Sequence, residues 1–340
     1  MQENKNNKKI ACTGAAGFIG SNFIEYLNKQ GYNNIDVYEK LDCLHNKWQN
    51  LAGLEFNNIL DYNLLLREDV INNYDWICIL GANSSTKTSK EEYQQTLFDN
   101  VEYPNTIINL FTSQLQFNPN RKLIFASSAA TYGLSENFKE RTSDIKPSNF
   151  YGLTKLMVDR NIERNIEILK SVEPVYSVNK RSDIHSSLYS FRFFNVFGKR
   201  EEHKAEANMT SPVSRFLAQE PPFILFNSAD PKYKTDEMSR DFIAVEDICS
   251  TLFWALTNKV PNGIFNLGSG VATTWKELLE IVCELKGYNF NEVVKYIDMP
   301  EEIKQHYQYY TKANISKLRA AGYKKDFINI KDAVKKLVEN

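Results

Sequence analysis

The chain has 340 residues, of which 42% are hydrophobic, and its 41 lysines and arginines are balanced by 42 aspartates and glutamates to a net charge of −1. This length supports one large or two closely packed domains with a sizeable core, and the balanced charge excludes an overall electrostatic attraction to nucleic acid or to a membrane surface. No apolar run approaches the ~20 residues that cross a bilayer, and the polar stretch 1–9 lacks the apolar core of a signal peptide.

The five cysteines are scattered along the chain and form no Cys-x-x-Cys pair: Cys12, Cys43, Cys78, Cys249 and Cys283. This spacing favours reduced, buried thiols over disulfide bonds or a zinc site. We therefore expect a cytoplasmic protein without a metal centre.

In the first half of the chain, short apolar runs alternate with segments of helical character. Residues 8–31 have the order strand, glycine turn, helix. Further strand-like runs are IDVYEK (35–40), DWICIL (75–80) and KLIFASS (122–128), and helix-like segments are 91–114 and 156–170. This alternation predicts the α/β class, with a Rossmann-type, doubly wound parallel sheet covered by helices on both faces.

The second half is less regular, and its polar segments 171–186 and 229–238 are expected to face solvent. We expect residues 1–193 to form the dinucleotide-binding domain, completed by about 243–269 and 312–324. Residues 194–340 would then form mainly a smaller, discontinuous α/β substrate domain. The ligand cleft should lie between the two domains, at the carboxyl edge of the sheet.

Three glycines, Gly14, Gly17 and Gly20, stand in TGAAGFIG between the first strand and the first helix. Glycine there permits a tight turn and lets the backbone approach a pyrophosphate, which then lies at the positive helix N-terminus. A tight turn can require glycine for steric reasons alone. The position between strand and helix nevertheless favours a dinucleotide-binding turn.

The end of the second strand bears on the choice of cofactor. Glu39 stands where an acidic residue commonly hydrogen-bonds the adenosine ribose, which favours NAD. Lys40 and Lys47 follow closely, and either can pair with a 2′-phosphate, which favours NADP, or be an ordinary surface charge. The residues leave NAD and NADP open.

Tyr151 and Lys155 are four residues apart in NFYGLTK, so on a helix both side chains project from one face. An ammonium beside a phenol favours the phenolate and lowers the tyrosine pKa from ~10 toward working pH. Tyr151 is then a candidate general base for a substrate hydroxyl as hydride leaves, and Lys155 can also bind the nicotinamide ribose. Ser127 and Ser128, at the end of an apolar strand, can hold the same substrate oxygen.

The glycine turn, the serine and the Tyr-x-x-x-Lys pair, in this order, resemble the extended short-chain dehydrogenase/reductase family, and within it the nucleotide-sugar epimerases and dehydratases. The resemblance covers nearly the whole chain and rests on TGAAGFIG, SSAATYG, YGLTK, FRFFNVFG, RDFIAVED and GIFNLGSG. It implies that Ser128, Tyr151 and Lys155 are catalytic. The cofactor contacts that it implies, besides the three glycines, are Phe18, Ile19, Asn100, Tyr151, Lys155 and Val196.

Within this family the chain is most similar to the ADP-glyceromanno-heptose 6-epimerases, in ANSST (82–86), NVFGKREEHK (195–204) and HYQYYTKAN (306–314). This resemblance implies oxidation at C6″ of an ADP-heptose, a transient 6-ketone, and return of the hydride to the other face. It implies a tightly bound cofactor, with NADP favoured over NAD. It also implies a homo-oligomer that supplies precursors of the lipopolysaccharide core or other surface glycans.

Lys204 matches the lysine to which the resemblance assigns a second acid/base role, opposite Tyr151. Inversion of one carbon presents hydroxyls in two orientations, and a second proton-handling group would serve the second orientation. Burial or a neighbouring cation, Arg200 or His203, would lower the lysine pKa from ~10.4. The simpler interpretation of Lys204 is a solvated loop lysine.

For the substrate, the resemblance implies contacts from Ser128, Asn195, Arg240 and Tyr307. Arg240 can bind a diphosphate with two N–H groups, or it can form a surface ion pair with Asp241 or Glu246. The segment AEANM after Lys204 is two residues longer than the family pattern, and Asn208 is the nearest match to the small polar serine of that pattern.

Two rival functions remain open. A hexose 4-epimerase would use the same catalytic set on a UDP- or GDP-sugar, and a non-catalytic dinucleotide-binding module would use the fold for assembly or redox sensing. The presence of Tyr151, Lys155 and Lys204 favours an enzyme. A 4,6-dehydratase is disfavoured because Ala129 and Ala130 offer no ionisable group for the removal of water. We expect a nucleotide-sugar substrate, and neither nucleic acid nor membrane as a partner.

Overall fold

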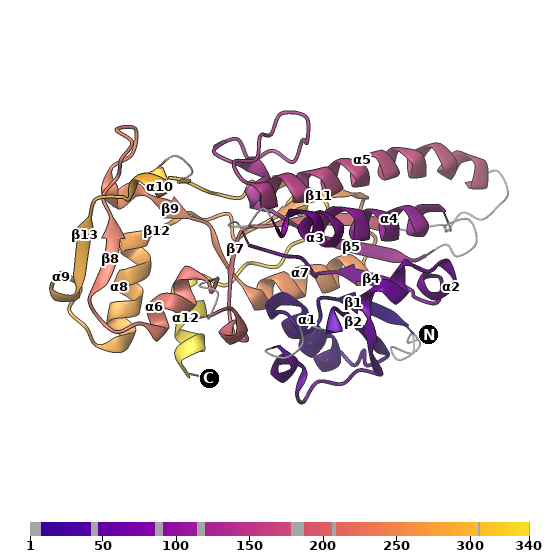
Figure 1. Ribbon diagram of the computed structural model, residues 1–340, viewed down its shortest axis with the longest axis horizontal. Helices are drawn as coiled ribbons and strands as arrows, with labels where there is room; N and C mark the ends of the chain where they lie inside the picture. The colour runs from indigo at the N-terminus through magenta and orange to yellow at the C-terminus, as the bar shows by residue number, and fades with distance from the viewer. Residues whose placement is uncertain are drawn as a thin grey trace.

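The computed structural model describes residues 8–41, 47–85, 91–113, 120–177, 187–205, 209–304 and 307–339, and for residues 171–177 it describes the backbone alone. The main feature is a parallel seven-stranded sheet (Figure 1) with the strand order β11-β6-β5-β4-β1-β2-β3. The strands are β1 (Ile10–Thr13), β2 (Ile35–Glu39), β3 (Asn58–Asp61), β4 (Trp76–Ile79), β5 (Lys122–Ser128), β6 (Ser187–Phe193) and β11 (Gly263–Leu267).

The sheet is wound in two directions from its centre. From β1 the chain moves to β2 and β3 on one side, then returns to β4 on the other side of β1 and continues through β5 and β6 to β11. Ligands of such sheets bind at the carboxyl ends of the strands, beside the point where the direction reverses. Gly14 directly follows β1 and Gly81 lies just beyond β4, so both glycines lie at this edge.

Helices cover both faces of the sheet (Figure 1). Helices α1 (Phe18–Lys29) and α7 (Val245–Thr257) pack on one face, and α4 (Tyr103–Ser113) and α5 (Phe150–Ser177) pack on the other. Phe23 and Leu27 of α1 belong to the core on the first face, and Ile107 and Phe111 of α4 to the core on the second. Every residue of β1 is buried, which explains why these short strands are continuous apolar runs rather than alternating patterns.

Several short elements complete this part of the molecule. They are η3 (Trp48–Leu51), η4 (Tyr62–Leu66), α2 (Glu68–Ile71), α3 (Tyr93–Leu97), η5 (Phe98–Glu102), η6 (Ala129–Tyr132) and α11 (Ser316–Ala320). The helix expected over 91–114 is realised as α3, a π-helical turn η5, and α4. π-Helical turns inside helices frequently occur at functional sites.

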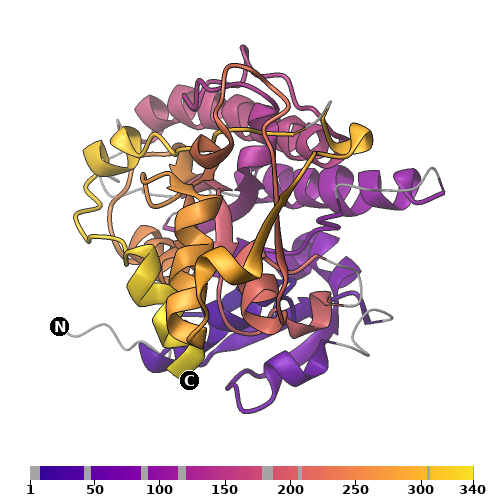
Figure 2. The same cartoon turned by 90° about the vertical axis from the view of Figure 1, so that its left-hand side faces the viewer.

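A smaller lobe of short paired strands and helices lies beside the large sheet and faces the viewer in Figure 2. Its strand pairs are β7 (Asn195–Phe197) with β10 (Phe242–Ala244), β9 (Ser239–Arg240) with β12 (Thr273–Thr274), and β8 (Phe223–Phe226) with β13 (Val294–Ile297). Its helical elements are η7 (Glu202–Lys204), α6 (Pro212–Ala218), η8 (Thr235–Glu237), α8 (Trp275–Lys286), α9 (Phe290–Val293), α10 (Glu301–Lys304) and α12 (Ile330–Glu339). A separate apolar cluster that includes Phe197, Phe223 and Leu279 forms its core.

The chain passes between the two parts more than once. After β10 it returns to the large sheet as α7 and β11, and β11 pairs in parallel with β6. The predicted α/β class and doubly wound parallel sheet are confirmed. The division into domains at about residue 193 stays a prediction.

Four cysteines, Cys12, Cys78, Cys249 and Cys283, are free and buried, and Cys43 lies outside the described residues. Within the described ranges, no helix combines the length and the apolar character needed to span a bilayer. The same ranges contain no group of three or more histidine, cysteine or acidic side chains placed to hold a metal ion. Contrary to the expected polar loop over 171–186, α5 continues as a helix to Ser177.

Candidate active site

Steric contact determines the shape of the glycine turn after β1. Gly14 has φ +65°, and a Cβ atom there would lie 2.2 Å from Gly81 Cα. A Cβ atom at Gly20 would lie 2.3 Å from the Gly14 carbonyl oxygen. These two glycines are therefore required by close backbone packing. Gly17 is less confined, since a Cβ atom there would lie 3.1 Å from the same oxygen.

The N-terminus of α1 is open to an anion. Its N-cap is Gly17, which provides no side-chain hydrogen bond, and its first turn carries no acidic residue. The main-chain N–H groups and the helix dipole are therefore available to a diphosphate group. The residues present fit a dinucleotide at this turn.

Two buried side chains fix the orientation of Ala16 in the middle of the turn. Its N–H donates to Glu39 Oε1 at 2.6 Å, and its carbonyl oxygen accepts from Asn50 Nδ2 at 2.9 Å. One carboxylate oxygen of Glu39, the residue expected at the ribose, thus supports the turn itself. Asn50 was not identified from the sequence, because nothing in KWQNL distinguishes it from other surface-helix residues.

Both lysines considered for a 2′-phosphate have an acidic neighbour. Lys47 Nζ lies 3.8 Å from Glu39 Oε2, and Lys40 Nζ lies 3.4 Å from Asp99 Oδ2. Burial raises the pKa of Glu39, and the charge of Lys47 partly opposes this. The two lysines lie at the end of β2 as expected, and the arrangement by itself leaves NAD and NADP open.

Asn100 supports the segment that follows β4. Its Oδ1 accepts from the Asn83 N–H at 2.8 Å, and its Nδ2 donates to the Asn83 carbonyl at 2.9 Å and to Thr154 Oγ1 at 3.2 Å. Asn100 lies in the π-helical turn η5 and is buried. It connects the carboxyl end of β4 with the first turn of α5. Asn83 was missed as a site residue, although it follows the strand in a Gly-Ala-Asn sequence that indicates a turn.

The structure brings together the serine, the tyrosine and the lysine. Tyr151 is hydrogen-bonded to the Ser128 side chain, and Ser128 Oγ also accepts from the Ala130 N–H at 3.1 Å. Lys155 is 2% exposed, and its Nζ donates to the Ala126 carbonyl at 2.8 Å and lies 5.8 Å from the centroid of the Tyr151 ring. The group lies where β5 ends and α5 begins.

The pKa of Tyr151 differs from the sequence-based expectation. Burial raises it to about 12, and the hydrogen bond with Ser128 lowers it by less. Burial lowers the pKa of Lys155 to about 8, and the Asp159 carboxylate opposes that shift. The expected lowering of the tyrosine pKa is not found because the ammonium of Lys155 is directed to a strand carbonyl rather than to the phenol oxygen.

A buried polar network lies next to Lys155. Asp159 forms an ion pair with Arg192 (Nε to Oδ2, 2.7 Å) and accepts from Ser190 Oγ at 2.6 Å. Arg192 also donates to the Tyr132 hydroxyl at 3.0 Å. Tyr132 ends η6, the turn that directly follows Ser128. The network therefore joins the serine side of the site to the helix that carries the tyrosine and the lysine.

The segment 199–204 lies along α1. Lys199 Nζ is 2.6 Å and Arg200 Nη1 is 3.2 Å from Glu25 Oε2. Lys204 Nζ lies 4.8 Å from the centroid of the Phe18 ring, the first residue of α1. Burial lowers the pKa of Lys204. The simple interpretation of Lys204 as a solvated loop lysine does not hold.

The two neighbours expected to act as cations on Lys204 do not do so. Arg200 is turned toward α1, where it also donates to the Ser21 carbonyl at 3.3 Å. His203 Nδ1 lies 3.1 Å from Asn50 Nδ2. Burial, with the charges of Lys204 and Lys47, lowers the pKa of His203 to about 4, so the ring is neutral near pH 7. Burial, and not a neighbouring cation, is what lowers the pKa of Lys204.

Arg240 is buried between aromatic rings. It is 7% exposed, and its guanidinium carbon lies 5.4 Å from the Trp275 ring centroid and 5.2 Å from the Tyr307 ring centroid. Its Nη1 donates to the Ser239 carbonyl at 2.9 Å. A guanidinium held between aromatic rings keeps further N–H groups for an anion.

Asp241 is not the partner of Arg240. Its carboxylate accepts from the main-chain N–H groups of Ser269 at 2.7 Å, Gly270 at 2.9 Å and Ala313 at 2.8 Å. The alternative of a surface ion pair between Arg240 and Asp241 is therefore wrong, because both side chains are buried and directed to other groups.

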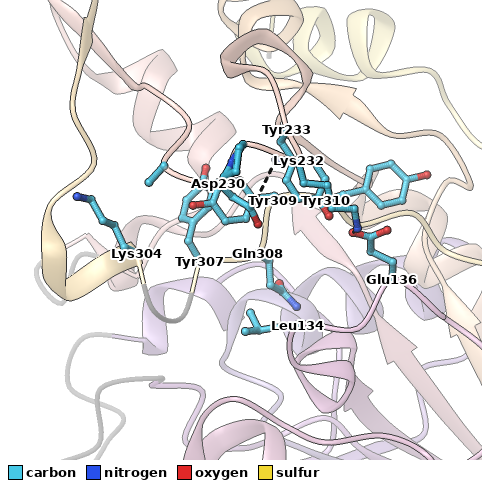
Figure 3. A pocket seen from close by; sticks show the side chains of 12 residues that line it. Leu134, Glu136, Asp230, Lys232, Tyr233, Lys304, Tyr307, Gln308, Tyr309 and Tyr310 are labelled. Atoms are coloured by element: carbon cyan, nitrogen blue, oxygen red, sulfur yellow. Dashed lines mark hydrogen bonds and ion pairs between the residues drawn. The ribbon is translucent and has the colours of Figure 1, made fainter.

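A pocket of about 440 Å³ has Tyr307 in its wall (Figure 3). Its other lining residues are Leu134, Glu136, 229–233, Lys304 and 308–310. The Tyr233 and Tyr309 rings are stacked, with centroids 5.0 Å apart and planes at 8°, and Lys232 forms an ion pair with Glu136. Residues 229–233, part of the polar segment expected to face solvent, thus line this pocket together with Leu134 and Glu136, which follow Ser128 in the chain.

The structure shows fewer contacts for the remaining candidate residues. Ile19 and Val196 pack against the apolar core beside α1. Asn195 begins β7, and its N–H donates to the Asp241 carbonyl at 3.0 Å. Asn208 lies outside the described residues.

The chain matches the NAD dependent epimerase/dehydratase family over residues 10–268. The ADP-L-glycero-D-manno-heptose-6-epimerase of Fusobacterium nucleatum is 30% identical to it, over 97% of this chain and 97% of that protein. The solved ADP-L-glycero-D-manno-heptose-6-epimerase of Helicobacter pylori has 21% identity and a TM-score of 0.74, over 100% of this chain and 98% of its own. The UDP-N-acetylglucosamine 4-epimerase of Methanobrevibacter ruminantium M1 has 24% identity and a TM-score of 0.73, over 98% and 97%.

At these identities the two solved structures establish the fold alone. The family match covers most of the chain, and the Fusobacterium relative spans nearly all of it. The glycine turn fits the nicotinamide dinucleotide that this family uses as its cofactor. The chain therefore belongs to the NAD-dependent epimerase/dehydratase family and is an NAD(P)-dependent nucleotide-sugar epimerase.

Proposed function

We propose that the enzyme interconverts ADP-D-glycero-β-D-manno-heptose and ADP-L-glycero-β-D-manno-heptose by inverting C6″. The proposal is supported by the full-length similarity to a relative that carries the name of this activity. The observation that carries it is Lys204, a partly buried lysine whose pKa is lowered by burial and whose ammonium packs on the first residue of α1. A second proton-handling group at the dinucleotide end would serve the hydroxyl in its second orientation.

Ser128, Tyr151 and Lys155 would act on the hydroxyl in one orientation. Ser128 would donate a hydrogen bond to the substrate oxygen, since its own oxygen is held by the Ala130 N–H. Tyr151 would take the hydroxyl proton as the alcohol becomes a ketone. Lys155 would have to release the Ala126 carbonyl to approach the phenol or a ribose hydroxyl.

Lys204 would act on the hydroxyl in the other orientation. A lysine with a lowered pKa has a larger neutral fraction at working pH, so it can accept a proton from one epimer and return a proton to the ketone. In the opposite direction of reaction, Tyr151 and Lys204 exchange these tasks. Asn195 is proposed to help hold the sugar between them.

The glycine turn would hold the dinucleotide by main-chain N–H groups at the start of α1. When bound, the dinucleotide supplies the hydride acceptor and donor for each turnover. We propose NADP, tightly bound, because Lys40 and Lys47 lie at the end of β2, where a 2′-phosphate would meet them. The negative charge of Glu39 would repel a 2′-phosphate. The measured preference between NADP and NAD therefore tests whether Lys40 and Lys47 bind that phosphate.

Arg240 is proposed to bind the diphosphate of the nucleotide sugar. It is held by two aromatic rings, and a planar guanidinium matches two phosphate oxygens at once. Tyr307 belongs both to this arrangement and to the wall of the pocket in Figure 3. The pocket would then take a part of the substrate that adjoins the diphosphate.

We also propose that the enzyme works in the cytoplasm as a homo-oligomer. The free, buried thiols support a reducing compartment. Leu153, Met157 and Ile168 on α5 are 41%, 37% and 52% exposed and offer an apolar surface to a second copy. Light scattering of the purified protein gives the number of subunits.

The deciding experiment is to incubate the purified enzyme with ADP-D-glycero-β-D-manno-heptose without added cofactor and to quantify both epimers by NMR. A mixture of epimers is expected, because the hydride is returned within each turnover. Lys204→Ala, folded and loaded with dinucleotide, should lose at least about 10²-fold in rate. Retention of dinucleotide without any turnover by the wild-type enzyme would overturn the heptose assignment. UDP- and GDP-hexoses would then test the alternative, a hexose 4-epimerase.

A further inference from the structure

One side chain, Asn50, joins the glycine turn to the segment that carries Lys204. Asn50 is 9% exposed and lies in η3. Its Nδ2 lies 2.9 Å from the Ala16 carbonyl oxygen and 3.1 Å from His203 Nδ1. An amide nitrogen has two hydrogens, so these two bonds use both, and the 3.5 Å approach to the Arg200 carbonyl is too long to compete.

The bond to His203 requires one form of the imidazole. Because the Asn50 amide nitrogen can only donate, His203 Nδ1 must accept, and the proton of the neutral ring is then on Nε2. Burial and the charges of Lys204 and Lys47 lower the pKa of His203 to about 4, which keeps the ring neutral near neutral pH, and the Nε2–H form of the neutral ring leaves Nδ1 to accept. The link is therefore present under ordinary conditions.

The two halves of the segment are attached differently. Its first half is fixed to α1 by Glu25, which pairs with Lys199 and Arg200. Its second half, the short η7 with His203 and Lys204, meets the dinucleotide end through the Asn50 bond and the contact with Phe18. Loss of the Asn50 bond would leave the contact of Lys204 with Phe18 to hold this half at the dinucleotide end.

We propose that Asn50 and His203 are positioning residues that hold Lys204 against the glycine turn, so that dinucleotide binding and the placement of Lys204 are coupled. Ala16 is the shared element, since its N–H is bound by Glu39 and its carbonyl by Asn50. Loss of the Asn50 hydrogen bonds would release both the Ala16 carbonyl of the turn and the His203 side chain of the segment that carries Lys204. The effect on turnover rests on the proposed acid/base role of Lys204, whereas the effect on dinucleotide release does not.

The test compares His203→Asn with His203→Leu. The asparagine Oδ1 can stand near the position of Nδ1 and accept from Asn50, whereas leucine has similar bulk and no acceptor. Three quantities are measured on the purified enzyme. They are the release rate of the bound dinucleotide, the rate at which acetic anhydride acetylates Lys204 by site-resolved mass spectrometry, and kcat with KM for ADP-heptose.

His203→Leu should release the dinucleotide several-fold faster, expose Lys204 to several-fold faster acetylation, and lower kcat by about 10- to 100-fold with KM little changed. His203→Asn should recover most of each quantity. Asn165→Ala is the matched control, because it removes a buried amide on α5 whose hydrogen bonds, among the described residues, are with Asn109 of α4 and Asn161 of α5. It should behave as the wild type.

Wild-type release and acetylation rates in a folded His203→Leu enzyme would overturn the proposal, as would equal defects in His203→Leu and His203→Asn. Should His203→Leu fail to fold, Asn50→Asp replaces both N–H groups by acceptors and must show the same defects. If the wild type turns over no ADP-heptose, the proposed function fails, but release and acetylation still decide the coupling.

Discussion

The dinucleotide end and the substrate end of the site are built in different ways. The dinucleotide end is formed mainly by residues 10–41 and 47–50, and its shape depends on main-chain contacts, including that of Gly14 with Gly81 after β4. The substrate end joins segments far apart in the sequence through side chains, as in the contacts of Arg240 with Trp275 and Tyr307.

This difference has a mechanistic consequence. A site built on main-chain contacts tolerates side-chain substitution except at its glycines and at the side chains that hold the turn, Glu39 and Asn50, whereas a side-chain site can be altered one residue at a time. Binding of the dinucleotide and binding of the nucleotide sugar should therefore be separable by mutation. The hydroxyl of Tyr151 is proposed to act on the substrate hydroxyl alone, so its loss should affect neither binding step.

The largest effect is expected for Tyr151→Phe, which removes the hydroxyl and keeps the ring. The rate of epimerisation should fall by about 10²–10⁴-fold, with dinucleotide content and KM near wild type. Tyr189→Phe removes a buried hydroxyl that donates to the Val260 carbonyl outside the site and serves as the control. Activity of Tyr151→Phe above a tenth of wild type would contradict the proposed role.

Arg240→Lys should affect the substrate end alone. Lysine keeps the charge but loses the planar pair of donors and the stacking between rings, so KM for the nucleotide sugar should rise about tenfold or more. Dinucleotide content should not change. Arg215→Lys, at an exposed arginine beside the Phe216 ring, is the control. Loss of dinucleotide from Arg240→Lys would show that the two ends are not separable.

Glu39→Gln should change dinucleotide affinity and leave KM for the nucleotide sugar unchanged. The expected factor is smaller than that for Arg240→Lys. Glutamine keeps an oxygen for the Ala16 N–H and removes the charge that lies near Lys47. The affinity for NADP relative to NAD should rise by about fivefold, as expected for a charge interaction of about 1 kcal/mol. Titration of the apo enzyme with each dinucleotide measures the ratio. Glu55→Gln is the control, and an equal change in both affinities would count against a 2′-phosphate site here.

Tyr309→Ala should have the smallest effect. It removes the ring that stacks on Tyr233 in the wall of the pocket, and KM should rise by about two- to tenfold because such ring pairs contribute about 0.5–1.5 kcal/mol. Tyr309→Phe keeps the stack and should match the wild type. An unchanged KM in Tyr309→Ala would place the pocket outside the substrate site.

The parts of the fold and site that follow from local backbone rules were predictable from the sequence. The alternation of short strands and helices predicts a parallel sheet with two helical faces, and glycine is favoured at position 14 by its φ of +65° and at position 20 by its approach to the Gly14 carbonyl oxygen. Tyr151 and Lys155 lie on the same side of α5 because they are four positions apart on one helix. These inferences need no knowledge of distant segments.

The parts that depend on distant segments were not predictable. The partner of His203 is Asn50, which lies far away in the sequence and carries no motif. The burial of Arg240 depends on Trp275 and Tyr307. The raised pKa of Tyr151 reflects the burial around its hydroxyl, which a four-residue spacing does not reveal.

The carboxylate of Asp241 has a consequence for how the chain is made. Its donors are Ser269, Gly270 and Ala313, all of which leave the ribosome after it. Chains fold from their N-terminal side as they are synthesised, so the strands around the glycine turn can form while this buried carboxylate still lacks its partners. The growing polypeptide is therefore expected to form its dinucleotide turn before its substrate lobe, which needs Ala313 to complete the site of Asp241.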